Sequence, residues 1–155
     1  MPEIINQNNQ IINEFLIQKQ VAKFADAVNR RDQKEFTSLW LSDGIWELKP
    51  PMNINVQGKE NIEQTFIQLL NNWEFFVQMA HSGVIEINGN QATARWCMNE
   101  IGRDYDGKGF QNFGMYEDQL ILQENIWLFI KRTYHFAYID EPKLSGTAFS
   151  LSHIV

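Results

Sequence analysis

The sequence changes its hydrophobic period near Trp73, and this change limits the folds that the chain can adopt. From Asn9 to Arg31, and again after Gly58, apolar residues recur at spacings that predict amphipathic helices. In the first helix the apolar face is expected to comprise Ile12, Phe15, Leu16, Phe24, Ala25 and Val28. From Glu74 to Tyr138, runs rich in aromatic and β-branched residues alternate with short turns, which predicts strands.

The order of the expected elements defines the fold class. Helices are expected at 9–31, at 32–40 and after Gly58, with a short strand at 44–48 that ends at Pro50-Pro51. Later strands are expected at 74–87, 91–102, 113–122 and 126–138. Short turns join antiparallel neighbours, because parallel strands need longer crossovers. We therefore expect one α+β domain spanning residues 1–155, with three N-terminal helices packed on one face of a mainly antiparallel sheet.

Composition excludes several classes of protein. The net charge of −6 and the pI of about 5.0 argue against nucleic-acid binding, which usually needs a basic patch. The 11 Phe, 5 Trp and 4 Tyr suggest an interior with aromatic walls. The single cysteine, Cys97, cannot form an intramolecular disulfide and is expected to be a buried, inert thiol. No pair of histidines has the spacing of a metal site, so we expect no metal and no other cofactor.

Targeting and membrane signals are missing from the sequence. The first ten residues have neither the basic nor the apolar region of a secretory signal. No apolar run approaches the roughly 18 residues that a membrane span requires. A cytoplasmic location is therefore expected, with no membrane partner.

A set of short motifs, taken in order, resembles a known family. The motifs are Phe24–Asp32, Leu39-Trp40, Asp43–Trp46, Gly58–Ile62, His81, Ala92–Trp96, Tyr116–Asp118 and Trp127 with Lys131-Arg132. Together they resemble the SnoaL-like branch of the nuclear transport factor 2-like superfamily, over about residues 12–138. That branch includes polyketide cyclases, scytalone dehydratase, hexachlorocyclohexane dehydrochlorinase and the β subunits of ring-hydroxylating dioxygenases.

The resemblance implies a cone-shaped fold whose curved sheet encloses a deep pocket closed by the long helix. It also implies a homodimer formed through the outer face of the sheet. The tail at 140–155 lies outside the resemblance. Because the superfamily includes enzymes, ligand carriers and interaction scaffolds, the fold alone does not define the function.

The resemblance further implies a catalytic histidine. His81 matches a histidine that acts as the base in the dehydratase and the dehydrochlorinase, and imidazole titrates near neutral pH. The alternative is a histidine hydrogen-bonded in the pocket wall. Asn29 stands where those enzymes carry an aspartate; it can orient His81 but stabilises an imidazolium less well, or it can satisfy backbone groups at a helix end. Asp26, nearly one turn earlier, is a weaker substitute.

Alternation along 91–102 predicts the residues that face the pocket. Ala92, Ala94, Trp96, Met98 and Glu100 share the more apolar face, so Glu100 is expected to point inward. Glu100 is interpreted either as a second acid or hydrogen-bond acceptor for a substrate, or as a partner of an arginine. The other residues expected to line the pocket, most of them through packing, are Trp46, Phe75, Met79, Tyr116 and Phe136.

Asp118 and Arg132 are expected to lie opposite each other, if the turn at 123–125 sets the register. A cross-strand ion pair is the preferred interpretation over ligand binding.

Three functions remain open at this point. The first is a lyase or isomerase of the dehydratase or cyclase type, without a cofactor, that acts on a cyclic or aromatic substrate with His81 as base. The second is a non-catalytic module that binds a hydrophobic ligand or forms oligomers. The third is a scaffold similar to a dioxygenase β subunit.

Overall fold

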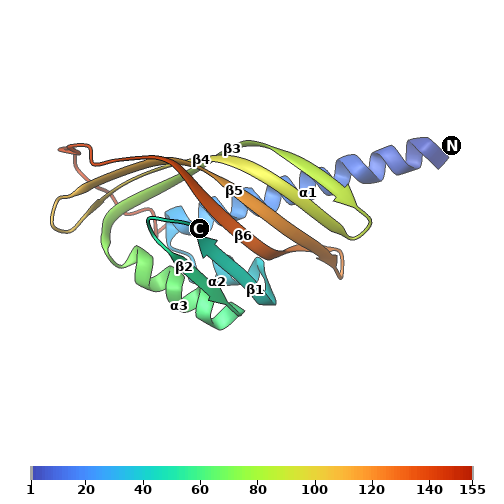
Figure 1. Cartoon of the computed structure of the whole chain (residues 1–155), viewed down its shortest axis with the longest axis horizontal. Coiled ribbons are helices and arrows are strands. Elements are labelled where there is room, and N and C mark those ends of the chain that lie inside the picture. Colours follow the sequence, from blue (N-terminus) through green and yellow to red (C-terminus); the bar gives the residue numbers. More distant parts are fainter. Residues whose placement is uncertain (1, 155) are drawn as a thin grey trace.

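The computed structural model describes residues 2–154, with side chains from residue 9 onward, and these residues form three helices and a six-stranded sheet (Figure 1). In chain order the elements are α1 (Pro2–Arg30), α2 (Gln33–Ser38), β1 (Trp40–Leu48), β2 (Ile54–Gln57), α3 (Lys59–Leu70), β3 (Trp73–Asn88), β4 (Gln91–Asp104), β5 (Gly109–Gln123) and β6 (Ile126–Asp140). The expected α+β class is confirmed.

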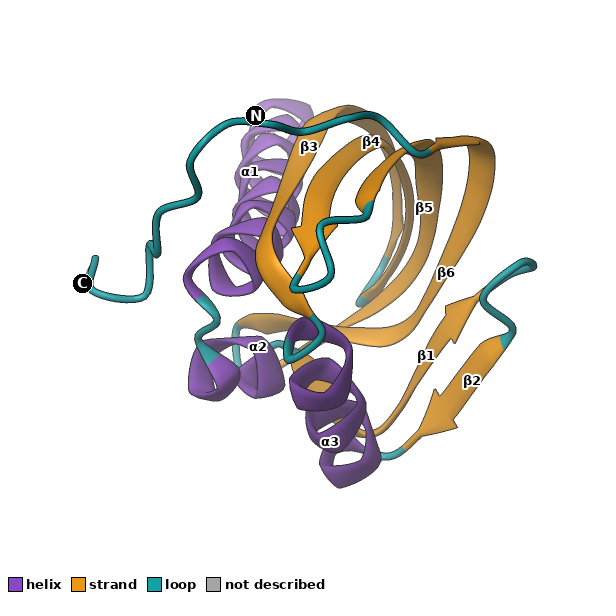
Figure 2. Cartoon of the chain, turned by 90° about the vertical axis from the view of Figure 1, so that its left-hand side faces the viewer, coloured by secondary structure: helices purple, strands orange, loops and turns teal. Residues whose placement is uncertain are grey.

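The sheet is mixed, and its strand order is β2-β1-β6-β5-β4-β3. Strands β3 to β6 form the expected antiparallel meander, whereas β1 pairs with β6 in parallel. Strand β2, which the sequence did not predict, returns beside β1 after Pro50-Pro51. Figure 2 shows that the sheet curls strongly around the helices, yet β2 and β3 do not pair, so the curl does not close.

Helix α1 packs its apolar stripe against the inner, concave face of the sheet. The buried side chains Ile17, Val21, Phe24 and Val28 follow the helical period. Ile12 and Phe15 are exposed, so their expected place on the packed face is wrong. The reason is their position around the helix, because Asn13 lies on the packed side and accepts a hydrogen bond from Trp127 Nε1 at 2.9 Å, while Ile12 and Phe15 point away from that side.

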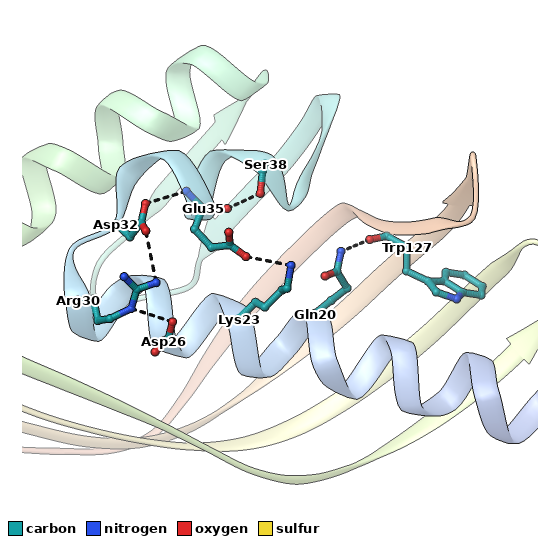
Figure 3. Close-up of polar contacts among 8 residues, drawn as sticks. All are labelled: Gln20, Lys23, Asp26, Arg30, Asp32, Glu35, Ser38 and Trp127. Carbon is teal, nitrogen blue, oxygen red and sulfur yellow. Dashed lines mark hydrogen bonds and ion pairs between the residues drawn. The ribbon is translucent and has the colours of Figure 1, made fainter. Parts of the chain in front are cut away.

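The second helix is shorter than expected. Asp32 caps it, since its Oδ1 accepts a hydrogen bond from the Glu35 backbone N–H at 2.9 Å, and Lys23 of α1 pairs with Glu35 at 3.1 Å (Figure 3). The helix ends at Ser38, and Trp40 already belongs to β1. The prediction of helix through residue 40 is wrong because Trp40 pairs with Phe129 of β6.

The alternation predicted for β4 is confirmed. Ala92, Ala94, Trp96, Met98 and Glu100 are buried on the inner face, and the residues between them face outward. Cys97 is one of the outward residues and is exposed, so the expected buried thiol is wrong.

The tail after β6 crosses back toward the end of α1 (Figure 2). Arg103 of β4 donates hydrogen bonds to the carbonyl oxygens of Leu144 and Gly146, and Arg30 donates to that of Ile154 at 3.1 Å. These contacts hold the tail across the ends of α1 and β4.

Candidate functional site

The inner face of the sheet and helix α3 border a cavity of about 260 Å³. Its walls are mainly aromatic and include Trp46, Phe66, Trp73, Phe76, Phe110 and Phe136. Among the residues that line it, Glu100 is the one with a carboxyl group, and none is a lysine, arginine or histidine. We call this space the Glu100 cavity.

Glu100 lies at the centre of a hydrogen-bond network. Gln78 Nε2 donates to Glu100 Oε1 at 2.5 Å, and Asn112 Nδ2 donates to Glu100 Oε2 at 2.6 Å. The Tyr134 hydroxyl donates in turn to Asn112 Oδ1. Gln78, Glu100 and Asn112 are direct cross-strand neighbours on β3, β4 and β5, so the sheet register brings them together. The two amides donate directly to the carboxyl group, and Tyr134 acts on it through Asn112.

Burial changes the acidity of this carboxyl group. The Glu100 side chain is 9% exposed, and burial raises the pKa of Glu100 above its usual value, against the opposing effect of the hydrogen bonds from Asn112 and Gln78. Burial also raises the pKa of Tyr116 and of Tyr134, so both phenols stay neutral. The cavity therefore holds an acid that can be protonated closer to neutral pH than an ordinary glutamate.

Asn29, at the end of α1, fixes the main chain of β3 beside this network. Asn29 Nδ2 donates to the Gln78 carbonyl oxygen at 2.9 Å, and the Gln78 N–H donates to Asn29 Oδ1 at 2.7 Å. Asn29 thus positions Gln78 through the backbone, and Gln78 holds Glu100 through its side chain.

Gly114 leaves the space that the Tyr134 ring occupies in this network. At Gly114 an added Cβ would lie 2.6 Å from carbons of the Tyr134 ring and 2.5 Å from the His135 carbonyl oxygen. The ring therefore passes over Gly114 to reach Asn112.

His81 lies outside the Glu100 cavity. It is exposed, and it borders a separate shallow hollow with Gln18, Val21 and Ala22 of α1. Both polar atoms of the Asn29 amide bond the Gln78 main chain rather than His81. The structure does not bring together the predicted His81 and Asn29 pair, and a catalytic role for His81 stays a prediction.

A β-bulge explains this placement. Ala80 pairs with Met98 and Gly83 pairs with Trp96, so two residues of β3, His81 and Ser82, lie opposite the single residue Cys97. Unbroken alternation back from the Asn88-Gly89 turn would place residues 75, 79 and 81 on the inner face. The bulge reverses the alternation and places Phe76, Gln78 and Ala80 there instead.

The other predicted site residues fall into two groups. Trp46, Glu100, Tyr116 and Phe136 line the Glu100 cavity. Phe75 and Met79 lie on the opposite face of β3 because of the bulge, and Trp96 and Met98 are buried in the core without lining that cavity.

Asp26 is also remote from the network. Its carboxylate is exposed and pairs with Arg30 at 2.9 Å on the outside of α1 (Figure 3). The helix turns this face away from the sheet, and a catalytic role for Asp26 stays a prediction.

Asp118 and Arg132 form a fully buried, bidentate ion pair. The distances are 2.8 Å from Arg132 Nε to Asp118 Oδ1 and 3.0 Å from Nη2 to Oδ2. The guanidinium carbon lies 3.9 Å from the ring centre of Tyr116, 4.1 Å from Phe24 and 4.3 Å from Phe129. The two charges neutralise each other within the core, while Arg132 Nη1 is buried without a hydrogen-bond partner.

Three residues of the network were not predicted from the sequence, namely Gln78, Asn112 and Tyr134. Two signals in the sequence pointed to them, namely Gly83 and Gly114 inside long strands, since glycine within a strand often marks a bulge or a close approach. At Gly83 a Cβ would lie 2.4 Å from the Arg95 carbonyl oxygen and from the Trp96 ring.

Two kinds of feature are absent from the part of the chain that the structure describes. Over residues 2–154, no three His, Cys, Asp or Glu residues gather in a way that could hold a metal ion. In the same range, no helix has the length and hydrophobicity needed to cross a membrane.

Comparison with known proteins identifies the family. A family model described as the SnoaL-like domain matches residues 14–133. The chain belongs to this family. No curated protein matches the sequence.

Solved structures share the fold of this SnoaL-like domain at low sequence identity. A candidate scytalone dehydratase from Novosphingobium aromaticivorans has 13% identity and a TM-score of 0.80, over 93% of this chain and 95% of its own. The hexachlorocyclohexane dehydrochlorinase LinA-type3 from Novosphingobium barchaimii has 16% identity and a TM-score of 0.80, over 92% and 97%. A candidate aromatic ring hydroxylase from N. aromaticivorans has 18% identity and a TM-score of 0.80, over 85% and 94%.

Proposed function

We propose that this SnoaL-like domain binds a small, largely apolar cyclic or aromatic molecule in the Glu100 cavity, and that Glu100 transfers a proton to or from it. The observation that carries the proposal is a single buried carboxyl group in an aromatic cavity, held by amides and free of any lysine, arginine or histidine in the lining. The reaction class is lyase or isomerase, of the dehydratase or cyclase type. The cavity is then the enclosed pocket that the family resemblance implies.

The chemistry follows from burial. A carboxyl group whose pKa is raised toward neutrality can donate a proton and later take one back. The amides of Gln78 and Asn112 stabilise the carboxylate that forms after donation, and the apolar walls limit access of water. Dehydration and dehydrochlorination, the reactions in the names of two structural neighbours, both remove a proton from carbon.

Proton transfer can be tested without knowledge of the natural substrate. The protein is incubated in D₂O with a panel of cyclic alcohols and ketones, including tetralol and tetralone, and mass spectrometry records loss of water or deuterium bound to carbon. Wild type should accelerate one or both above buffer. Glu100→Gln, which keeps the shape of the side chain, should reduce the rate by about 10²- to 10⁴-fold.

His81→Gln is the second arm of this experiment. Activity that survives in His81→Gln and disappears in Glu100→Gln assigns the proton transfer to Glu100. The reverse result assigns it to His81, as the family resemblance implied. Saturable binding with no chemical change across the panel supports the ligand-binding module, and co-purification with an iron–sulfur protein supports the dioxygenase-type scaffold.

We also propose that the domain forms a homodimer through the outer face of the sheet. Exposed apolar side chains gather on the outward positions of β3 to β6, namely Met79, Val84, Phe113, Met115 and Tyr138. An apolar surface of this kind is typical of an interface. Light scattering on the purified protein should give the mass of a dimer, and Met115→Lys should give a monomer; a monomeric wild type would contradict the proposal.

A further inference from the structure

The charges around the Glu100 cavity are asymmetric. The side chains that line it offer one acidic group and no basic group. Among the residues that the structure describes, the buried cation is Arg132, and its charge is paired with that of Asp118 at 2.8 Å. A negative charge that develops on a ligand would therefore meet no cationic side chain in the lining, whereas a positive charge would meet a carboxyl group.

The walls favour a positive charge for a second, independent reason. Six of the lining side chains are Trp or Phe, and the faces of such rings carry negative electrostatic potential. The same interior already uses this property, because the Arg132 guanidinium lies within 4.3 Å of the centres of three rings. Trp73, a half-buried residue of the wall, packs against Phe76 and Phe110, each with its ring centre 5.4 Å away.

The geometry points to a cavity that stabilises positive charge on its ligand. The cavity therefore binds organic ammonium ions, and its substrates react through a carbocation that these ions mimic. The reaction part of this inference rests on the proposed function, while the binding part does not. The ligand class is a cyclic or aromatic body with one cationic centre beside Glu100.

For an alcohol substrate the steps balance as follows. The Glu100 proton moves to the hydroxyl oxygen, the C–O bond breaks with its electron pair, water leaves and the carbon becomes cationic. The Glu100 carboxylate, held by Gln78 and Asn112, then takes a proton from the neighbouring carbon, and the C–H electron pair forms the C=C bond. The net change is loss of water, and Glu100 is again protonated.

A pair of isosteric probes isolates the charge. Benzyltrimethylammonium and neopentylbenzene have the same shape, but the first carries a positive nitrogen where the second has carbon. Isothermal calorimetry on the full chain should show about tenfold or greater preference for the ammonium ion in wild type. Glu100→Gln should weaken ammonium binding and leave neopentylbenzene binding unchanged.

Two further variants separate local from general effects. Glu117→Gln removes one negative charge from an exposed position on the outer face of β5, so it tests the influence of the overall net charge of −6. It should keep the preference. Trp73→Leu should reduce the preference about threefold or more, and Trp73→Phe, which retains a ring face, should restore most of it.

The outcomes are distinct. Equal or tighter binding of neopentylbenzene in wild type overturns the inference, as does an equal loss of preference in Glu117→Gln and Glu100→Gln. If neither probe binds, the inference is overturned, and the D₂O experiment then decides the proposed function by itself. An ammonium preference without deuterium transfer or loss of water in the D₂O experiment supports the charge selectivity and refutes the proposed reaction.

Discussion

Two carboxyl groups are buried on the inner face of the same sheet, and they are held in different ways. Asp118 on β5 receives two hydrogen bonds from Arg132, so its charge is neutralised at 2.8 and 3.0 Å. Glu100 on β4 receives hydrogen bonds from the neutral amides of Gln78 and Asn112. A buried charge is stable when it is paired, and otherwise tends to become protonated or to find a ligand. Asp118 is therefore a structural group, whereas Glu100 remains available for chemistry.

The largest effect is expected when the ion pair is broken. Asp118→Asn leaves the Arg132 guanidinium buried without a counter-charge, and the free energy of unfolding should fall by about 3–5 kcal/mol. Urea denaturation followed by circular dichroism measures this loss. Glu117→Gln, one residue earlier and exposed, should change stability by less than about 0.5 kcal/mol.

Gly114→Ala is expected to lower the free energy of unfolding by a smaller amount and to disturb the Glu100 cavity specifically. The added methyl group would displace the Tyr134 ring, so Asn112 would lose its partner, and unfolding should become easier by about 1–3 kcal/mol. Any Glu100-dependent proton transfer in D₂O should fall as well. Gly146→Ala is the control, because nothing lies within 4 Å of a Cβ there and its stability should be unchanged. A Gly114→Ala variant with wild-type activity would show that Tyr134 does not organise the network.

The smallest effect is expected in the dependence of stability on pH. The folded pKa of Glu100 is raised, so between the unfolded value of 4.5 and the folded value the folded state holds more protons. Its contribution to stability is therefore present below that range and is lost as pH rises through the folded pKa. The ionisable groups that face Glu100 are the phenols of Tyr116 and Tyr134, which stay neutral throughout.

Glu100→Gln should remove this fall in stability, whose slope is at most about 1.4 kcal/mol per pH unit, and urea titrations at a series of pH values from 4.5 upward measure it. The contribution of Glu47 to stability should depend on pH in the opposite direction, because hydrogen bonds from Lys49 and Lys131 lower the pKa of Glu47 to about 2. Its contribution is present above pH 4.5 and is lost as the pH falls toward 2. An identical pH profile for Glu100→Gln and wild type would mean that Glu100 is solvated like an ordinary glutamate.

Local patterns in the sequence were sufficient for most of the fold. The change of period at Trp73 predicted the helices and the antiparallel meander, and alternation along β4 placed Glu100 inward. The parallel pairing of β1 with β6 could not be predicted this way, since it joins residues as far apart in the sequence as Trp40 and Phe129. The hydrophobic period of a segment does not indicate which distant segment it pairs with.

The candidate site was predicted only in part, and one structural feature accounts for most of the difference. The sequence indicated Trp46, Glu100, Tyr116 and Phe136, and Glu100 lies on β4, where burial alternates without a break from Gln91 to Gly102. On β3 the bulge at His81 and Ser82 reversed the alternation, so Gln78 rather than His81 faces the network. A bulge depends on how two strands fit together, here on the close approach of Gly83 to Trp96, and not on the period of either strand.

The sequence by itself therefore determined which segments form helices and strands, because hydrophobic periodicity is a local property. It also determined which family the chain resembles, because that resemblance is the sum of many short motifs in order. Only the tertiary structure decided that Asn29 holds the backbone of Gln78, that Tyr134 reaches Asn112 over Gly114, and that Glu100 has amides instead of a cation around it. Those contacts join residues from α1, β3, β4, β5 and β6, and their existence depends on strand register and curvature.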